Sequence, residues 1–94
     1  MRTIERTAAF RRDYKRVRAT PRHRDVELQF VEVVKRLVED QALDPRHHDH
    51  PLIGNWQEHR ECHIKPDLLL IYKLPDADTL RLVRIGSHSE LFSK

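Results

Sequence analysis

The stretch HPLIGNWQEHRECHIKPDLLLIYK, residues 50–73, decides the fold of this 94-residue chain. It ends in the most hydrophobic run of the sequence, residues 68–72, which predicts a buried central strand. The single tryptophan, the single cysteine and three histidines all lie before that run. A sheet-forming core therefore adjoins a cluster of groups that transfer protons near neutral pH.

Hydrophobic periodicity predicts two helices before this stretch and strands within and after it. The first helix has apolar residues at i, i+4 and i+7, and the second has a broader apolar stripe that predicts packing on the sheet. The predicted elements are a weak edge strand at 2–6, a helix capped by Thr7 and ending at 19, a helix at 25–40, a loop at 41–54, strands at 57–64, 68–74 and 79–87, and a last turn capped by Ser87 and Glu90. The order β-α-α-β-β-β predicts one α+β domain over residues 1–94, with a helical hairpin packed on an antiparallel sheet.

Alternation within residues 57–64 places Cys62 and Ile64 on one side of the strand and Glu61 and His63 on the other. Cys62 is therefore predicted to be a buried structural residue rather than a nucleophile. As the only cysteine it cannot form an internal disulfide, which favours a reducing cytoplasm. The chain also lacks an apolar run of the ~20 residues that a membrane helix needs, and its arginine-rich start lacks the apolar stretch of a secretory signal.

Charge is distributed unevenly along the chain. Residues 1–24 contain nine Lys or Arg and two acidic residues, a net charge of +7; the whole chain has +3, so the remaining seventy residues sum to −4. A basic segment on a small domain is typical of a protein that binds a polyanion, because each phosphate contact releases counterions. The alternative is that the arginines only keep a small helix soluble. The pattern favours a nucleic-acid partner.

Two kinds of chemistry compete for the histidines. The tetrapeptide at 47–50, His-His-Asp-His, suggests a metal, but it has no cysteine pair and lies on a proline-flanked loop, so a solvated loop is favoured and no metal or cofactor is predicted. The other reading is general acid–base catalysis on a phosphodiester. RNA cleavage needs a base for the 2′-OH, a cation for the charged phosphorane and an acid for the leaving 5′-oxygen.

Five residues fit this second chemistry if the sheet closes as predicted, because they then converge on one face: His50, His63, Asp67, Arg84 and His88. Histidine suits both proton roles because its unperturbed pKa is about 6.5, and the guanidinium of arginine fits a phosphate. Each residue singly also has a structural explanation, as a partly buried ring, a turn residue or a surface ion pair. Together, and beside a basic helix, they favour a ribonuclease.

Two motifs carry a family resemblance: DHPLIGNWQEHRECHIKPDLLLIYKL at 49–74 and LRLVRIGSHSELF at 80–92. Together they resemble the YafQ branch of the RelE superfamily of type II toxin–antitoxin toxins. The first motif there reads close to D-H-P-L-x-G-x-W-x-x-x-R-[DE]-x-H-x-x-P-D-x-x-L-I-Y-K, and the second reads R-x-G-[ST]-H-x-x-L-F. The likeness extends over the whole chain and is densest in its second half. It implies the RelE-like microbial ribonuclease fold.

The resemblance implies a ribosome-dependent endoribonuclease, an mRNA interferase that cleaves mRNA in the A site of the 30S subunit. Cleavage would proceed by attack of the 2′-OH through acid–base catalysis without metal or cofactor. The implied partners are a cognate antitoxin, ribosomal RNA and mRNA, with operator DNA contacted only through the antitoxin and with no membrane. Two rivals are a ParE-like toxin that binds DNA gyrase and a catalytically silent toxin that acts only in operon autoregulation.

Carried over by residue, the catalytic group falls on His50, His63, Asp67 and His88. His88 is the expected general acid, and the base is either His50 or His63 oriented by Asp67. Substrate binding falls on Glu61, on Arg84 bracing the scissile phosphate and on Phe92 stacking with a base. The basic face expected to dock on ribosomal RNA comprises Arg11, Arg12, Lys15, Arg16 and Arg18.

Three positions within the first motif affect its interpretation. Glu61 stands where the family favours Asp, which keeps the charge and moves the carboxylate by one methylene. Glu58 stands where Gly is frequent, which leaves the local bend of that strand open. Trp56 is interpreted as a core residue rather than a platform for a base.

Overall fold

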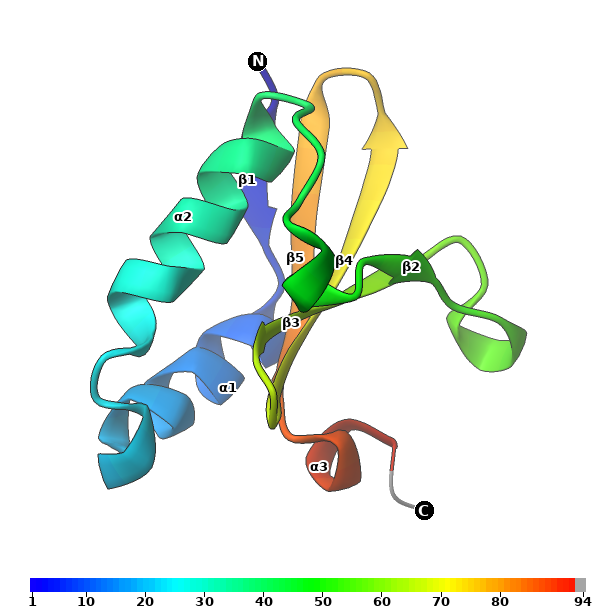
Figure 1. Cartoon of the computed structure of the whole chain (residues 1–94). Coiled ribbons are helices and arrows are strands. Elements are labelled where there is room, and N and C mark those ends of the chain that lie inside the picture. The colour runs from blue at the N-terminus through cyan, green and yellow to red at the C-terminus, as the bar shows by residue number, and fades with distance from the viewer. Residues whose placement is uncertain (93–94) are drawn as a thin grey trace.

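The computed structural model describes residues 1–92; Ser93 and Lys94, the last two residues of the predicted domain 1–94, lie outside the described part. A helical pair lies beside one face of a five-stranded sheet, as Figure 1 shows. The elements are, in chain order, β1 (Thr3–Arg6), α1 (Ala8–Ala19), η1 (Pro21–His23), α2 (Val26–Val38), η2 (Pro45–His47), β2 (His50–Pro51), η3 (Gly54–Trp56), β3 (Arg60–Lys65), β4 (Leu68–Asp76), β5 (Thr79–Gly86) and α3 (His88–Phe92). This arrangement is the α+β architecture that the sequence predicts.

The sheet has the strand order β1-β5-β4-β3-β2, so β4 is the central strand as predicted. Pairs β2–β3, β3–β4 and β4–β5 are antiparallel, but β1 runs parallel to β5. The prediction of a purely antiparallel sheet is therefore wrong at this edge. Both helices and three other strands separate β1 from β5 in the chain, and such a long connection can return a strand in the parallel sense.

The helical hairpin begins and ends close to its predicted limits. The hydroxyl of Thr7 accepts the N–H of Phe10 at 3.0 Å and caps α1, as predicted. Thr20 precedes Pro21, and the helix ends there because proline disfavours helical geometry in the preceding residue. Helix α2 ends two residues earlier than the predicted limit of 40.

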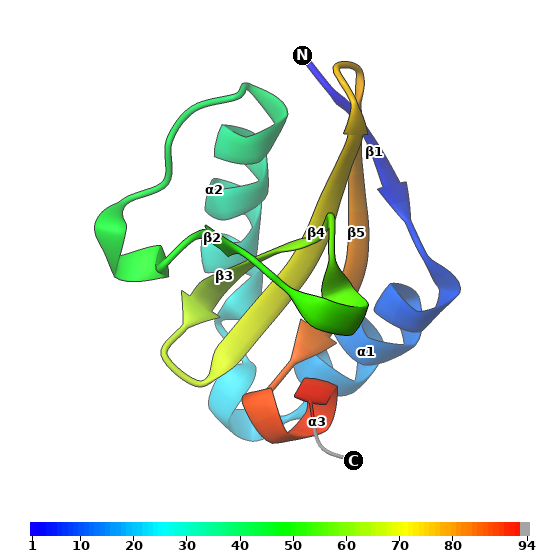
Figure 2. The same ribbon diagram turned by 90° about the vertical axis from the view of Figure 1, so that its right-hand side faces the viewer.

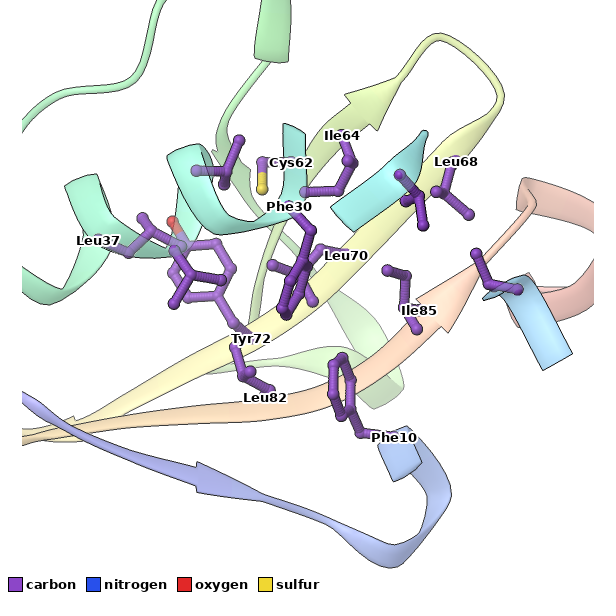
Figure 3. Close-up of a cluster of buried hydrophobic side chains, with 14 of the residues drawn as sticks. Phe10, Phe30, Leu37, Cys62, Ile64, Leu68, Leu70, Tyr72, Leu82 and Ile85 are labelled. Atoms are coloured by element: carbon purple, nitrogen blue, oxygen red, sulfur yellow. The ribbon is translucent and has the colours of Figure 1, made fainter. Parts of the chain in front are cut away.

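The main hydrophobic core lies between the helical pair and the sheet (Figure 3). Cys62 is completely buried there, which confirms the structural role predicted for it, and burial raises the pKa of its thiol. Each leucine, isoleucine or valine buried in such a core contributes about 1.5–3 kcal/mol. The side chains drawn from the helices and strands include Phe10, Phe30, Leu37, Ile64, Leu68, Leu70, Tyr72, Leu82 and Ile85.

A second, smaller hydrophobic cluster covers the opposite face of the sheet. Its buried members are Leu69 and Ile71 from β4 and Leu91 from α3. Leu52, Trp56, Val83 and Phe92 pack against them. Residues 68–72 are therefore buried on both faces, which explains the continuous apolar run. The cluster also attaches α3 to the face of the sheet that the helical pair leaves open (Figure 2).

The segment predicted as a loop, residues 41–54, contains two short elements, η2 and β2. Strand β3 begins at Arg60 rather than at 57, because η3 and a turn occupy the preceding residues. In that turn Glu58 has a φ of 72°, the left-handed conformation that glycine adopts most easily. Within residues 1–92 no helix has the length and apolar character needed to cross a membrane.

Candidate active site

Strand register brings the predicted site residues into two rows across one face of the sheet. In one row His50 pairs with Glu61, Glu61 with Ile71, and Ile71 with Arg84. In the neighbouring row His63 pairs with Leu69, which pairs with Gly86 at the end of β5. Leu69 and Ile71 belong to the second hydrophobic cluster, so both rows lie on the face opposite the helical pair.

Glu61 lies between two of the candidate histidines. Its Oε1 atom is 3.7 Å from Nε2 of His50 and 3.6 Å from Nε2 of His63. The Glu61 side chain is 7% exposed, whereas the imidazoles of His50 and His63 are 48% and 27% exposed. A buried carboxylate thus lies beside two imidazole rings that solvent or a substrate can reach.

The loop that carries His50 is held by its neighbouring histidines. Nδ1 of His47 donates to the carbonyl of His63 at 2.6 Å, and Nδ1 of His50 donates to the carbonyl of His48 at 2.6 Å. The ring of His48 lies 5.1 Å from the ring of His63. These contacts leave Nε2 of His50 directed at Glu61, whereas His47 and His48 both contact His63. Within residues 1–92 no group of three or more His, Cys, Asp or Glu side chains is arranged to hold a metal ion.

A polar network not predicted from the sequence anchors the same loop to the core. The hydroxyl of buried Tyr72 donates to Oδ1 of Asp49 at 2.6 Å, and Nε of Arg60 donates to that hydroxyl at 3.3 Å. Burial and the bond to Asp49 raise the pKa of Tyr72, so the hydroxyl stays a donor at any physiological pH. Tyr72 looks like an ordinary apolar strand residue in the sequence, and only the return of the loop onto β4 gives its hydroxyl a partner.

Asp67 pairs with a different residue from the one predicted, His63. It lies in the turn between β3 and β4, half exposed, with its Oδ2 atom 3.7 Å from Nη1 of Arg22. Among the described residues no ion pair joins Asp67 to His63, and Glu61 makes that contact instead. The expectation that Asp67 orients His63 is therefore wrong, because Asp67 sits in the turn, where η1 supplies its partner.

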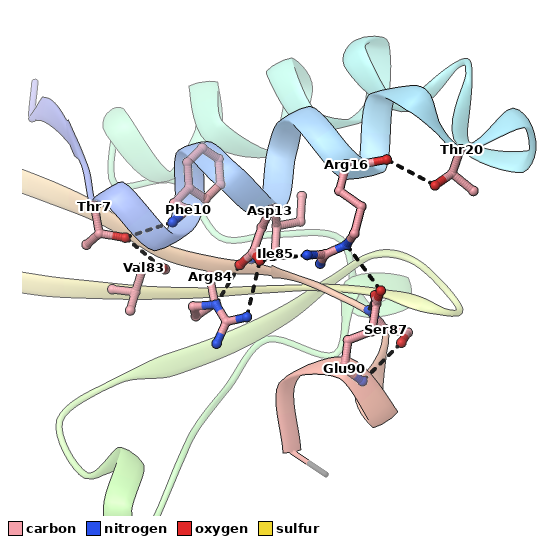
Figure 4. A network of polar contacts seen from close by, with 10 residues as sticks. All are labelled: Thr7, Phe10, Asp13, Arg16, Thr20, Val83, Arg84, Ile85, Ser87 and Glu90. Carbon is pink, nitrogen blue, oxygen red and sulfur yellow. Dashed lines mark hydrogen bonds and ion pairs between the residues drawn. The ribbon is translucent and has the colours of Figure 1, made fainter. Parts of the chain in front are cut away.

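Arg84 is held by a carboxylate from the first helix. Nε and Nη2 of Arg84 donate to Oδ2 and Oδ1 of Asp13 at 2.5 and 3.1 Å (Figure 4). Asp13 also accepts the N–H of Ile85 at 3.2 Å, a strand-edge donor that β1 leaves unpaired because its pairing with β5 stops at Leu82. Within residues 1–92, Nη1 of Arg84 makes no hydrogen bond, and it remains available to a phosphate.

The electrostatics of this pair follow from its burial. Asp13 is 3% exposed, and burial raises the pKa of its carboxyl, but the bonds from Arg84 and Ile85 outweigh that effect and hold the pKa below its usual value. The bond to Asp13 in turn raises the pKa of Arg84. Sequence reasoning missed Asp13 because it lies among arginines. Its position on the apolar stripe, three residues after Phe10 and four before Val17, is the signal that could have identified it.

Helix α3 carries the remaining candidates onto the same face. His88 is exposed and its ring lies 5.0 Å from that of Phe92, whose ring meets Trp56 edge-on at 6.1 Å. Trp56 and Phe92 both pack on the second hydrophobic cluster, which fits the interpretation of Trp56 as a core residue. Leu91 and Phe92 thus attach α3, the helix that begins with His88, to the face of the sheet opposite the helical pair.

All five predicted cations of the basic face are exposed, and four of them form no ion pair within the described residues. Arg11, Arg12, Lys15 and Arg18 are exposed, and none of them forms an ion pair with any other residue between 1 and 92. The guanidinium of Arg18 lies 5.9 Å from the centre of the Tyr14 ring. Arg16 differs because it pairs with two carboxylates, Asp13 and Glu90.

Comparison with known proteins identifies the family. The sequence model of the family described as bacterial toxin of type II toxin–antitoxin system, YafQ, matches residues 2–93. The mRNA interferase toxin YafQ of Escherichia coli strain K12 is 36% identical over 91 residues, which cover 97% of this chain and 96% of that protein.

Solved structures agree with this match. The crystal structure of YafQ from E. coli strain BL21(DE3) has a TM-score of 0.86 at 33% identity and covers 99% of this chain and 100% of that chain. A structure of the DinJ–YafQ complex of E. coli has a TM-score of 0.82 at 31% identity, with 99% and 100% coverage. The chain belongs to the YafQ family of bacterial toxins of type II toxin–antitoxin systems.

Proposed function

We propose that this chain is an mRNA interferase, a single-domain endoribonuclease that acts in the cytoplasm on mRNA in the ribosomal A site. The observation that carries the proposal is the position of Glu61 between His50 and His63 on the sheet face over which α3 brings His88. Its relative in E. coli is named an mRNA interferase toxin, and the partner of that relative, DinJ, supports a cognate antitoxin as the partner here.

The reaction begins with removal of the 2′-OH proton by the imidazole of His50 or His63. The 2′-oxygen attacks phosphorus, the bond from phosphorus to the 5′-oxygen breaks, and His88 protonates that leaving oxygen. The products are a 2′,3′-cyclic phosphate and a free 5′-hydroxyl. Glu61 stabilises the imidazolium formed on the base, and the free Nη1 of Arg84 stabilises the charge on the phosphorane.

The remaining predicted residues act in binding. Phe92 stacks with or wedges a base next to the scissile bond, since its ring borders both His88 and Trp56. The exposed cations of α1 contact ribosomal RNA. Asp67 is paired with Arg22 in the turn and is assigned no part in proton transfer.

His88→Ala tests the proposal with ribosomes carrying a defined mRNA. We expect cleavage to fall by about 10²- to 10⁴-fold, with little change in stability because His88 is exposed. His59→Ala, in a ring that contacts Trp56 and lies outside the candidate set, should cleave as the wild type does. Cleavage by His88→Ala at the wild-type rate would remove the proton donor from the mechanism. DNA breaks with intact mRNA after wild-type expression would instead identify a gyrase toxin.

A further inference from the structure

A chain of polar contacts connects α1 to α3 through Arg16. Nη1 of Arg16 donates to Oδ1 of Asp13 at 3.2 Å, on the carboxylate that also holds Arg84. Nε of the same guanidinium lies 3.2 Å from Oε2 of Glu90 on α3 (Figure 4). One buried carboxylate thus bonds to Arg84 directly and is linked through Arg16 to α3; the Arg16 and Glu90 side chains are 45% and 44% exposed.

Glu90 uses its two carboxylate oxygens for different purposes. Oε1 accepts the N–H of Ser87 at 2.8 Å, and the hydroxyl of Ser87 accepts the N–H of Glu90 at 3.2 Å. This reciprocal capping box defines the first turn of α3. Oε2 is left to meet Arg16, so the same side chain stabilises the turn internally and joins it to α1. The bond from Ser87 and the charge of Arg16 hold the pKa of Glu90 below its usual value.

Little space is left between Gly86 at the end of β5 and the side chains of Arg16 and Glu90. A Cβ atom added at Gly86 would lie 3.0 Å from Oε1 of Glu90, 3.2 Å from Nη2 of Arg16 and 3.3 Å from Cδ2 of Leu91. Glycine therefore lets the end of β5 approach both members of the ion pair.

We propose that Arg16 and Glu90 are positioning residues that hold α3, and therefore His88 and Phe92, in register with the sheet. The inference rests on the proposed function, since it assigns a role in the same cleavage site. A helix of five residues has no stability of its own, so tertiary contacts must place it. Leu91 and Phe92 supply the apolar contacts near the end of the helix, and the Arg16–Glu90 pair adds a polar contact to α1.

A positioning role predicts different behaviour from the RNA-binding role that sequence analysis assigns to Arg16. A cation that contacts ribosomal RNA affects affinity and its salt dependence. A residue that places His88 affects the rate of cleavage once the toxin is bound, because small misplacements of a proton donor are costly. Glu90 separates the two roles further, since a carboxylate cannot bind phosphate.

Trp56 provides a measurement that does not depend on activity. It is the only tryptophan of the chain, and its ring contacts Phe92 on α3. If the ion pair places α3, breaking it should expose the indole and increase quenching of its fluorescence by acrylamide. The test therefore compares Glu90→Gln with wild type in both quenching and single-turnover cleavage at saturating ribosome concentration. Glutamine keeps an oxygen for the N–H of Ser87 and removes only the charge that meets Arg16.

We expect Glu90→Gln to lower the single-turnover rate by about 10- to 100-fold, to leave the half-saturating ribosome concentration unchanged, and to increase quenching. Arg16→Ala also breaks the bond to Asp13 and should lower the rate at least as much, and the double variant should be no slower than Arg16→Ala, because that change already removes the contact with Glu90. Glu32→Gln, an exposed carboxylate on α2, is the matched control and should keep the wild-type rate and quenching.

Three results would overturn the inference. The first is a wild-type rate in Glu90→Gln, whether or not quenching changes. The second is an unchanged quenching with a slower rate, which would mean that the pair acts other than by placing α3. The third is additive losses in the double variant. Absence of cleavage by the wild-type chain is a separate outcome that counts against the proposed function, and quenching would still decide whether the pair holds α3.

Discussion

Glu61 and His63 lie two residues apart on β3 and point to the same face, with Oε1 of Glu61 3.6 Å from Nε2 of His63. The strand period of two residues makes this contact unavoidable once one face of β3 is buried against the helical pair. A carboxylate at this place can serve His63 and, across the β2–β3 pairing, His50 as well. The first prediction concerns this shared carboxylate.

Glu61→Gln should lower cleavage about 10- to 100-fold, because the imidazolium formed on the base loses its counter-charge. The same change should not lower the free energy of unfolding at neutral pH, and a gain of up to about 1 kcal/mol is expected. A carboxylate that is nearly buried and paired with histidines only at ion-pair distance carries a desolvation cost that glutamine avoids. Single-turnover cleavage and urea denaturation measure the two effects.

Glu61→Asp is the matched control for this prediction, because it retains the charge and matches the residue that the family favours. It should keep most of the activity. If Glu61→Gln cleaved as fast as the wild type, Glu61 would have no part in the reaction. If it also unfolded more easily, Glu61 would be a structural residue.

The exposed cations of α1 should determine the salt dependence of ribosome binding. Reversing Arg11 and Arg12 to Glu removes two potential phosphate contacts, and each contact contributes about 0.7–0.9 to the slope of log affinity against log salt. We expect the slope to fall by about 1.5 and stability to stay unchanged, because neither residue pairs with any side chain in the described part. Reversal of Lys35 and Arg36 on α2 alters the net charge equally and serves as the control. Equal effects of both reversals would exclude a specific basic face on α1.

Asp13 should make the protein sensitive to acid. Its pKa is lowered in the folded state, because bonds from Arg84 and Ile85 outweigh the burial that would raise it. A carboxyl of this kind contributes stability above its unfolded pKa of about 3.9, and the contribution is lost as the pH falls through the lower folded pKa.

Asp13→Asn should therefore cost about 2 kcal/mol at pH 7, since it leaves Arg84 without a charged partner and Arg16 with Glu90 alone. The difference from wild type should shrink as the pH falls below about 4, as first the unfolded and then the folded wild-type carboxyl takes up a proton. Urea denaturation at pH 7 and pH 3 measures both values. A difference that stayed constant with pH would show that the ionised form of Asp13 contributes no stability.

Glu58→Gly should stabilise the fold by about 0.5–1 kcal/mol, because glycine adopts the left-handed φ of this turn without the clash of a Cβ atom. Glu39→Gly at the end of α2 is the control, since Glu39 has a φ of −91° and gains nothing from glycine. Thermal unfolding of both variants measures the difference. Loss of stability in Glu58→Gly would mean that the glutamate side chain has a role that outweighs its backbone strain.

The elements of this fold were predictable where the sequence encodes them locally. The apolar run at 68–72 predicts the central strand, the spacing of apolar residues predicts both helices, and the hydroxyl of Thr7 caps α1 as expected. The direction of β1 and the short strand β2 were not predictable, because their partners lie far along the chain and neither strand has a strong pattern. The same contrast applies to the candidate site.

Residue types and spacing were sufficient to identify the family and to nominate the histidines and the arginine as candidates, because side-chain chemistry and short motifs are properties of the chain read in order. Folding determined which carboxylate serves which cation. Glu61 replaces Asp67 as the partner of His63, and Asp13 holds Arg84 from 71 positions away. Ion pairs of this kind depend on how strands register and where helices dock. Those arrangements minimise the free energy of the whole core, and they cannot be recognised in the sequence of any single segment.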